Sequence, residues 1–371
     1  MRGRTRLLVM QGTPYCNLSC DYCYLPNRDD RSRMPHEVVH KAVAWLYDHG
    51  LASDPLSVVW HAGEPLTLPP SWYAEAFARA AAAAGGPLVH SIQTNGVALS
   101  DRWCDLFLEH GVQVGVSLDG PARLHDARRR TRKGGGTHAM VMRGIDLLRR
   151  RGVPFHVICV VTSATLDAPD ELADFFLAEG VGMVCFNVEE IEGANTRSSL
   201  ATADTPDRYR RFLDRVLERT EQSGGLAIRE AETLLGQLLD PRFGEIAYND
   251  QNTPFSILTV THTGEMATFS PELAGLSHPV HGSFHFGNVD STLEDALRNP
   301  RFNALWAEVQ TGVEACAARC RYFRLCGGGA PANKLAEHGH MAGTETMHCR
   351  LANQATADAL LCRLERKLTT V

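Results

Sequence analysis

Hydrophobic residues in the first 225 positions follow two alternating spacings. Short apolar runs such as 5–10 ("TRLLVM") have the composition of buried strands, and the longer segments between them carry an apolar residue every three or four positions, as amphipathic helices do. In the segment 36–50, one helical face is formed by Val38, Val39, Ala42, Val43 and Leu46. The alternation of the two patterns predicts a parallel sheet with helical crossovers.

Six strand–helix units are predicted in this part of the chain. The strands are expected at 5–10, 56–60, 87–92, 112–118, 154–162 and 181–188, and the helices at 36–50, 72–86, 101–111, 138–152, 169–180 and 207–225. Six such units can build an open doubly wound sheet or part of a barrel. In both folds, ligands bind at the carboxyl ends of the strands.

The pattern changes after about Gly225. Residues 253–273 predict two strands around a Thr–Gly turn, and 292–309 predict a helix broken by a proline. A stretch rich in cysteine and glycine follows at 316–334, and a closing helix is expected from about Leu351. We therefore expect two domains, 1–235 and 236–371.

The composition narrows the function classes. The 371 residues carry a net charge of −6 with no basic arm, so nucleic acid is not the expected partner. No signal peptide and no membrane-spanning run is seen, and we expect a cytoplasmic protein. The eleven cysteines then need an explanation other than disulfides. Four of them, on apolar patterns, are interpreted as small buried hydrophobic residues: Cys104, Cys159, Cys185 and Cys362.

Three cysteines follow the first predicted strand at the spacing Cys16-x3-Cys20-x2-Cys23. Zinc usually takes four ligands, and the nearest histidine is His36. A redox dithiol needs only two cysteines. Three thiolates can also hold three corners of a [4Fe-4S] cluster and leave the fourth iron open for a substrate or cofactor.

Further motifs end the next predicted strands in order: "HAGEP" (61–65), "QTNG" (93–96), "SLDGP" (117–121) and then "HDARR" (125–129). With the cysteine loop, this series resembles the radical S-adenosylmethionine (SAM) enzymes. The resemblance implies a partial (β/α)6 barrel of the radical SAM type. It also implies that the open iron binds SAM, and that one electron then yields a 5′-deoxyadenosyl radical, which abstracts hydrogen from an unactivated C–H bond.

The same resemblance assigns SAM contacts. Glu64, after Gly63, is expected to accept a hydrogen bond from the methionine ammonium, although Ala62 replaces the first glycine of the usual Gly-Gly-Glu-Pro motif. The remaining expected contacts are Tyr22 and the Tyr24 backbone at the adenine, Ser117 near the ribose, Asn95, and Arg129 at the SAM carboxylate or a peptide. The other basic residues around Arg129 are interpreted as a solvated loop.

Four more cysteines, Cys316, Cys320, Cys326 and Cys349, are enough to close a second [4Fe-4S] cluster, with zinc as the alternative. The stretch resembles the SPASM extension of peptide-modifying radical SAM enzymes. Ser270 and Ala330 stand where that extension usually has cysteines, so its first auxiliary cluster is expected to be absent. Two [4Fe-4S] clusters and SAM are therefore the predicted cofactors.

A finer resemblance is to the cyclophane-forming maturases of glycine-rich-repeat precursors, carried by 186–195, 268–273, 326–334 and 344–350. It implies a carbon–carbon crosslink between an aromatic ring carbon and the β-carbon two residues on in a precursor peptide. It also implies an external donor of the flavodoxin or ferredoxin type, and no separate leader-binding domain is seen. Glu189 and Glu190 are candidates for proton transfer or substrate binding.

Three alternatives stay open. One is a small-molecule enzyme of natural-product biosynthesis, for example one that inserts sulfur into a nucleotide or sugar. Another is a sulfatase-type maturase that oxidises a Cys or Ser side chain. The last is an iron–sulfur protein without enzymatic activity.

Overall fold

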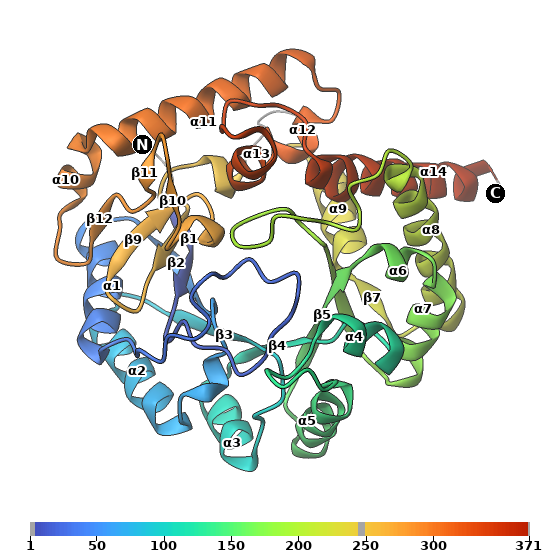
Figure 1. Ribbon diagram of the computed structural model, residues 1–371, viewed down its shortest axis with the longest axis horizontal. Coiled ribbons are helices and arrows are strands. Elements are labelled where there is room, and N and C mark those ends of the chain that lie inside the picture. The colour runs from blue at the N-terminus through green and yellow to red at the C-terminus, as the bar shows by residue number, and fades with distance from the viewer. Residues whose placement is uncertain (1–3, 244–248, 370–371) are drawn as a thin grey trace.

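One sheet of ten strands forms the frame of residues 4–243 and 249–369, the part of the chain that the computed structural model describes (Figure 1). In sheet order the strands are β12 (Gly287–Asn288), β9 (Glu265–Thr268), β8 (Ile257–Val260), β1 (Thr5–Met10), β2 (Ala52–Trp60), β3 (Leu88–Thr94), β4 (Gln113–Ser117), β5 (Phe155–Val161), β6 (Met183–Val188) and β7 (Ala227–Ile228). Neighbouring strands from β8 to β7 are parallel, and β9 and β12 continue the sheet antiparallel. A separate hairpin pairs β10 (Ser277–His278) with β11 (Gly282–Ser283).

Helices follow most strands and lie outside the curved sheet (Figure 1). In the first part of the chain they are α1 (His36–Asp48), α2 (Pro70–Ala83), α3 (Asp101–His110), α4 (Ala122–Arg128), α5 (His138–Arg151), α6 (Ser163–Leu166), α7 (Pro169–Ala178), α8 (Thr205–Ser223) and α9 (Arg229–Leu239). In the last part they are α10 (Leu293–Arg298), α11 (Pro300–Arg319), α12 (Phe323–Cys326), α13 (Pro331–His338), a π-helical segment Cys349–Ala355 and α14 (Thr356–Thr369).

The six predicted strand–helix units are confirmed, and the fold is the expected partial barrel with a C-terminal extension. Along β2 and β3, residues of a buried outer face alternate with residues of a half-buried inner face. Trp60 of β2 is fully buried and packs against Trp72 and Tyr73. Helix α1 buries Val39 and Leu46 of its predicted apolar face against this core.

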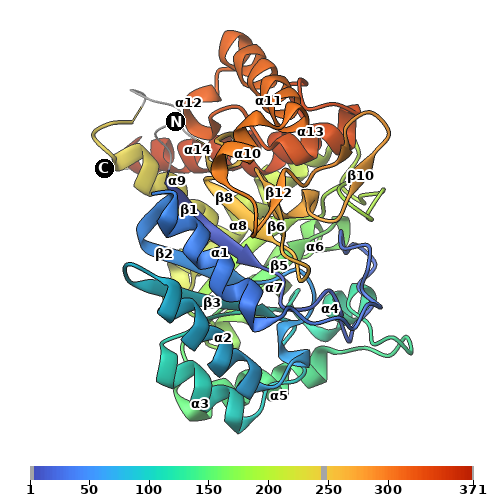
Figure 2. The same cartoon turned by 90° about the vertical axis from the view of Figure 1, so that its left-hand side faces the viewer.

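The C-terminal part closes the open side of the curved sheet. In Figure 1, α11 and α14 cross from the β12 end of the sheet to α8, and Figure 2 shows them above the barrel. Sheet pairing also continues into the C-terminal part, because β8 lies parallel to β1. The domain boundary at 235/236, which falls within α9, stays a proposal.

Some helices and one cysteine differ from the expectations. Helices α4, α6, α9, α12 and α13 were not predicted, since each is short or lies in a stretch rich in charge or glycine. Cys362 is exposed and not buried, because it lies on the outer face of α14, whereas the cysteines at 104, 159 and 185 are buried as predicted. No helix in the described ranges is long and apolar enough to cross a membrane.

Candidate functional site

A cavity of about 450 Å³ lies at the carboxyl ends of the barrel strands. Every residue that the sequence analysis assigned to catalysis or SAM binding lines it: Cys16, Cys20, Tyr22, Cys23, Tyr24, Gly63, Glu64, Asn95, Ser117, Arg129, Glu189 and Glu190. These residues come from the ends of different strands, and the parallel sheet brings those ends to one edge. The motifs that are separate in sequence therefore form one site.

The cysteine loop follows β1, and hydrogen bonds to the backbone of Cys16 fix its position. The amide of Cys16 donates to the Arg28 carbonyl (3.1 Å), and Arg132 Nε donates to the Cys16 carbonyl (2.8 Å). Arg132 thus holds the loop, although its segment was interpreted as solvated. Burial raises the pKa of Cys16 to about 12 and that of Cys20 to about 11. Both would be protonated at neutral pH without a metal, and binding iron would release their protons.

The loop after β2 contains the "HAGEP" motif (61–65), and its contacts show why this motif needs a glycine at position 63. A Cβ at Gly63 (φ 140°) would lie 2.1 Å from the Thr13 carbonyl oxygen, so only glycine fits beside the cysteine loop. The amide of Glu64 donates to the Tyr15 carbonyl (2.8 Å) and completes this contact. Ala62 has φ 65°, a left-handed conformation that glycine would adopt with less strain.

Glu64 is buried and its carboxylate accepts three hydrogen bonds from the protein. The donors are the Leu66 amide (3.0 Å), the Thr94 hydroxyl (2.6 Å) and the Asn95 amide (2.8 Å). Burial raises the pKa of Glu64, and the three hydrogen bonds oppose that shift. A carboxylate has about four acceptor positions, so one remains for a ligand.

Arg129 is buried and forms a bidentate pair with Asp119 (2.9 and 3.0 Å), which also accepts a hydrogen bond from Tyr22. Burial alone would raise the pKa of Asp119, but the Arg129 guanidinium, supported by these hydrogen bonds, holds it below the usual range. The second terminal nitrogen of Arg129, Nη1, makes no hydrogen bond in the described part of the chain, so it is available to an anion. Asp119 was missed as a site residue, although it is the acid of the "SLDGP" motif.

The side chains of the other expected SAM contacts, Asn95, Ser117 and Tyr24, differ in the hydrogen bonds that they make to the protein. The Asn95 side chain donates to Asn17 (2.7 Å), while the Ser117 hydroxyl makes no hydrogen bond to any described residue. The Tyr24 hydroxyl lies 3.1 Å from His61 Nε2. Burial lowers the pKa of His61 to about 4, so its ring is neutral, and its Nδ1 finds no partner in the described residues.

The two glutamates at the end of β6 have different environments. Glu189 is buried, and its carboxylate is engaged by Arg128 and by the amide (2.8 Å) and hydroxyl of Ser199. Glu190 accepts a hydrogen bond from Asn333 (2.5 Å) and lies 3.7 Å from His348. Glu189 thus accepts three hydrogen bonds from the protein, whereas Glu190 links the barrel to the C-terminal extension.

Two further carboxylates line the cavity and were missed by the sequence analysis. Burial raises the pKa of Glu192 well above its usual range, with further contributions from Glu190, Glu272 and Cys23. Burial also raises the pKa of Glu272, which accepts a hydrogen bond from Ser270. No side-chain hydrogen bond to a described residue is formed by Glu192. Two signals in the sequence could have found these residues: both lie in stretches that carry the finer resemblance, 186–195 and 268–273, and Glu192 is two positions from Glu190.

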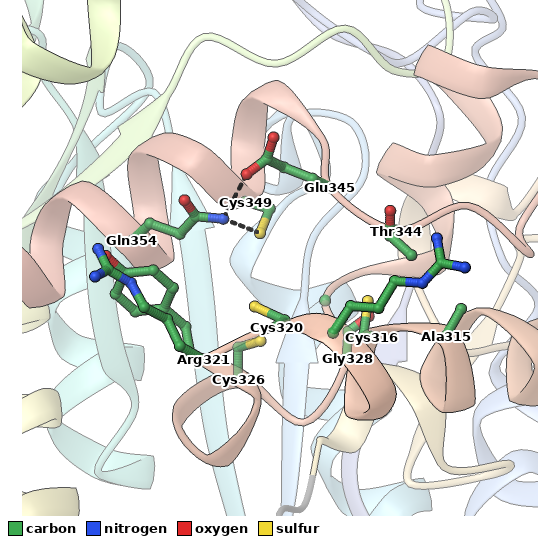
Figure 3. A pocket seen from close by; sticks show the side chains of 13 residues that line it. Ala315, Cys316, Cys320, Arg321, Cys326, Gly328, Thr344, Glu345, Cys349 and Gln354 are labelled. Atoms are coloured by element: carbon green, nitrogen blue, oxygen red, sulfur yellow. Dashed lines mark hydrogen bonds between the residues drawn. The ribbon is translucent and has the colours of Figure 1, made fainter.

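A second cavity of about 340 Å³ lies in the C-terminal extension. Figure 3 shows that the sulfurs of its four cysteines point toward one space, with Cys349 on the opposite side from Cys320 and Cys326. Gln354 donates to the Cys349 sulfur (3.6 Å) and to Glu345 (2.8 Å). Burial raises the pKa of Cys349 to about 11, so ligation would release a proton here too.

The four sulfurs fit a cluster better than a zinc ion. A tetrahedral zinc site, with Zn–S of about 2.3 Å, needs sulfurs about 3.8 Å apart. Among residues 4–243 and 249–369, however, no three His, Cys, Asp or Glu side chains are placed to hold a single metal ion. A cubane is held by sulfurs spread around a wider space than a single ion requires, and the four cysteines here line one cavity. Lys334 is also consistent with a negatively charged group at this site. It is 2% exposed, and among the described residues its ammonium donates a hydrogen bond only to the Cys316 sulfur (3.7 Å).

Ser270 and Ala330, the positions at which the sequence lacks cysteines, are both buried. Ser270 donates to Glu272 and lies beside the first cavity, and not among the four cysteines of the second. These observations agree with a single set of auxiliary ligands in the extension.

Comparisons with known proteins give the family. A model of the radical SAM superfamily matches residues 10–176. An uncharacterized protein of Synechocystis sp. is 39% identical over 99% of this chain and 94% of its own length. A serine-type anaerobic sulfatase-maturating enzyme of Klebsiella pneumoniae is 36% identical over 86% of this chain and 80% of its own length.

Two solved structures share the fold. The structure of anSMEcpe with bound AdoMet and Cp18Cys peptide matches with a TM-score of 0.77 and 22% identity, over 98% of this chain and 99% of the other. The crystal structure of Streptococcus suis SuiB bound to precursor peptide SuiA matches with a TM-score of 0.67 and 16% identity, over 94% and 76%.

These matches confirm the expected fold class and, through the family, the expected cofactors, SAM and [4Fe-4S] clusters. The finer resemblance to cyclophane-forming maturases is not confirmed by them. The chain belongs to the radical SAM superfamily, in the family that includes the anaerobic sulfatase-maturating enzymes.

Proposed function

We propose that this radical SAM enzyme modifies a ribosomal peptide by joining an aromatic ring carbon to a nearby β-carbon. The observation that carries the proposal is the set of four cysteines around the second cavity, Cys316, Cys320, Cys326 and Cys349. Four thiolates close a cluster, so no iron is left for a substrate. Such a centre suits electron transfer, which an oxidative crosslink requires.

The cofactor sites follow from the two cavities. In this proposal, Cys16, Cys20 and Cys23 hold the cluster that binds SAM, and Glu64 and Arg129 bind its ammonium and carboxylate. Tyr22, Tyr24, Asn95 and Ser117 are the proposed contacts to its adenosine. When bound, SAM supplies the 5′-deoxyadenosyl radical that abstracts hydrogen, and the closed cluster supplies an electron acceptor.

The crosslink removes two hydrogens from the peptide, one as an atom and one as a proton with an electron. Glu192 is our proposed proton acceptor, because it faces the cavity with a raised pKa and no side-chain hydrogen bond to a described residue. Glu189 is less suited, since Arg128 and Ser199 already engage its carboxylate. Its role is to anchor the loop after β6, and Glu190 positions α13 through Asn333.

The setting of the reaction is also proposed. The substrate peptide is a separate molecule, and a flavodoxin- or ferredoxin-type donor in the cytoplasm would supply the electron. Relatives whose structures contain a bound peptide cover nearly all of this fold, which supports a peptide substrate.

Sulfatase-type oxidation of a Ser or Cys side chain is the second candidate. It is favoured by the 36% identity to a serine-type sulfatase-maturating enzyme. The single set of auxiliary cysteines argues for the crosslink, because the full extension has ligands for two clusters and Ser270 and Ala330 replace cysteines here.

Coexpression with a short peptide encoded nearby, followed by intact-mass and tandem mass spectrometry, tests the proposal. A crosslink removes two hydrogens and suppresses fragmentation between the joined residues. Oxidation of serine to an aldehyde also removes two hydrogens, so an aldehyde-reactive hydrazide is the necessary control. A hydrazide adduct favours the second candidate. An unmodified peptide together with sulfur gained by a nucleotide or sugar favours the small-molecule enzyme.

A further inference from the structure

Lys334 has an unusual environment for a cation. It lies on α13 and is 2% exposed, yet it forms no ion pair with a carboxylate in residues 4–243 and 249–369. Its ammonium lies 3.7 Å from the Cys316 sulfur, the only hydrogen-bond partner of Nζ in that part of the chain. A buried ammonium needs a compensating negative charge, and the neighbouring groups that can supply it are thiolates.

The surrounding backbone leaves room for this side chain. A Cβ at Gly312, on α11 one turn before Cys316, would lie 2.9 Å from the Lys334 ammonium. A Cβ at Gly329, in the loop after Cys326, would lie 3.8 Å from the lysine Cε. Glycine at 312 thus keeps the space beside the lysine ammonium free of a side chain, and Gly329 lies at ordinary contact distance from the lysine stem.

Two other side chains near the four cysteines differ from Lys334 in charge or in exposure. Gln354 is a neutral donor to Cys349 (3.6 Å). Arg321 lines the same cavity, but its side chain is 78% exposed. Burial lowers the pKa of Lys334, and the nearby Cys316 sulfur opposes that shift. The lysine ammonium thus lies beside a ligand sulfur and away from solvent, where a charge acts more strongly than an exposed one.

We propose that Lys334 acts through Cys316 as a positioning residue that raises the reduction potential of the cluster held by Cys316, Cys320, Cys326 and Cys349. This inference rests on the proposed cluster site. A cluster gains one negative charge when it is reduced, so a fixed cation beside a ligand sulfur stabilises the reduced form. A higher potential lets the cluster accept the electron that the peptide loses with its second hydrogen, while the proton goes to Glu192.

The test uses the full-length chain with Cys16, Cys20 and Cys23 replaced by alanine, so that only the C-terminal cluster contributes. After anaerobic reconstitution, the reduced cluster is followed by electron paramagnetic resonance during a potentiometric titration. In Lys334→Met, the ratio of reduced to oxidised cluster at a fixed potential should fall about tenfold, which is about 59 mV for one electron. Arg321→Met, the matched control, should change the ratio by less than about twofold.

Each outcome decides a separate claim. A triple-cysteine variant without iron would overturn the proposed cluster site itself. About four irons, with the same titration curve for Lys334→Met and the parent, would leave the cluster in place and overturn the role of Lys334. Loss of iron in both Lys334→Met and Lys334→Gln would also overturn it, because the residue would then be needed to hold the cluster and not to set its potential.

Discussion

Glu64→Gln is the substitution that most sharply tests the SAM site. Three of about four acceptor positions of the Glu64 carboxylate are taken by Leu66, Thr94 and Asn95 at 2.6–3.0 Å. The proposed ligand ammonium takes the last one. A glutamine keeps the size but loses the charge, and a hydrogen bond to a charged group contributes about 1.5–3 kcal/mol. The Kd for SAM should therefore rise about 10- to 150-fold.

Isothermal titration calorimetry of anaerobically reconstituted protein measures this change. Glu75→Gln is the matched control, because Glu75 is an exposed glutamate of α2 paired with Arg79 and should leave the Kd unchanged. Since burial raises the pKa of Glu64, SAM affinity of the parent should fall as the pH drops through that raised pKa, and Glu64→Gln should lose this dependence. A folded Glu64→Gln variant with a Kd within twofold of the parent would refute the assigned role.

The remaining predictions concern the clusters, a carboxylate and a glycine. The reconstituted parent should contain about eight irons, and the variant with alanine at Cys16, Cys20 and Cys23 about four; four irons with zinc in the parent would contradict two clusters. Glu192→Gln should stabilise the protein above about pH 4.5, because the raised pKa of Glu192 means that its ionisation costs stability as the pH rises through that pKa. Thermal unfolding at two pH values checks this, and an equal gain at low pH would count against it. Gly63→Ala should cost more than about 2 kcal/mol in chemical denaturation, since its Cβ would lie 2.1 Å from a carbonyl oxygen, whereas Gly135→Ala should be tolerated.

The sequence predicts the frame of this site well, because the relevant signals are local. Alternating apolar patterns locate β1 to β6, and the cysteine loop and the motifs at 61–65, 93–96 and 117–121 stand at strand ends, so a parallel sheet must bring these motifs together. The demand for glycine at position 63 is equally local, since the chain turns there against the cysteine loop.

What the sequence does not reveal depends on contacts between distant segments. The partner of Arg129 is Asp119, and Glu189 is occupied by Arg128; neither pairing follows from spacing. Glu192 and Glu272 become a cavity pair only when the loop after β9 folds over the barrel. Lys334 looks like an ordinary helix residue until α13 packs beside α11.

The most direct test of the proposed crosslink follows a labelled hydrogen. The peptide identified by coexpression is synthesised with deuterium on the β-carbon that becomes joined, and SAM-derived 5′-deoxyadenosine is analysed by mass spectrometry after anaerobic turnover. We predict one deuterium in 5′-deoxyadenosine and a peptide that has lost that deuterium and one ring hydrogen. Unlabelled 5′-deoxyadenosine beside a modified peptide would contradict it, as would S-adenosylhomocysteine with a methylated peptide.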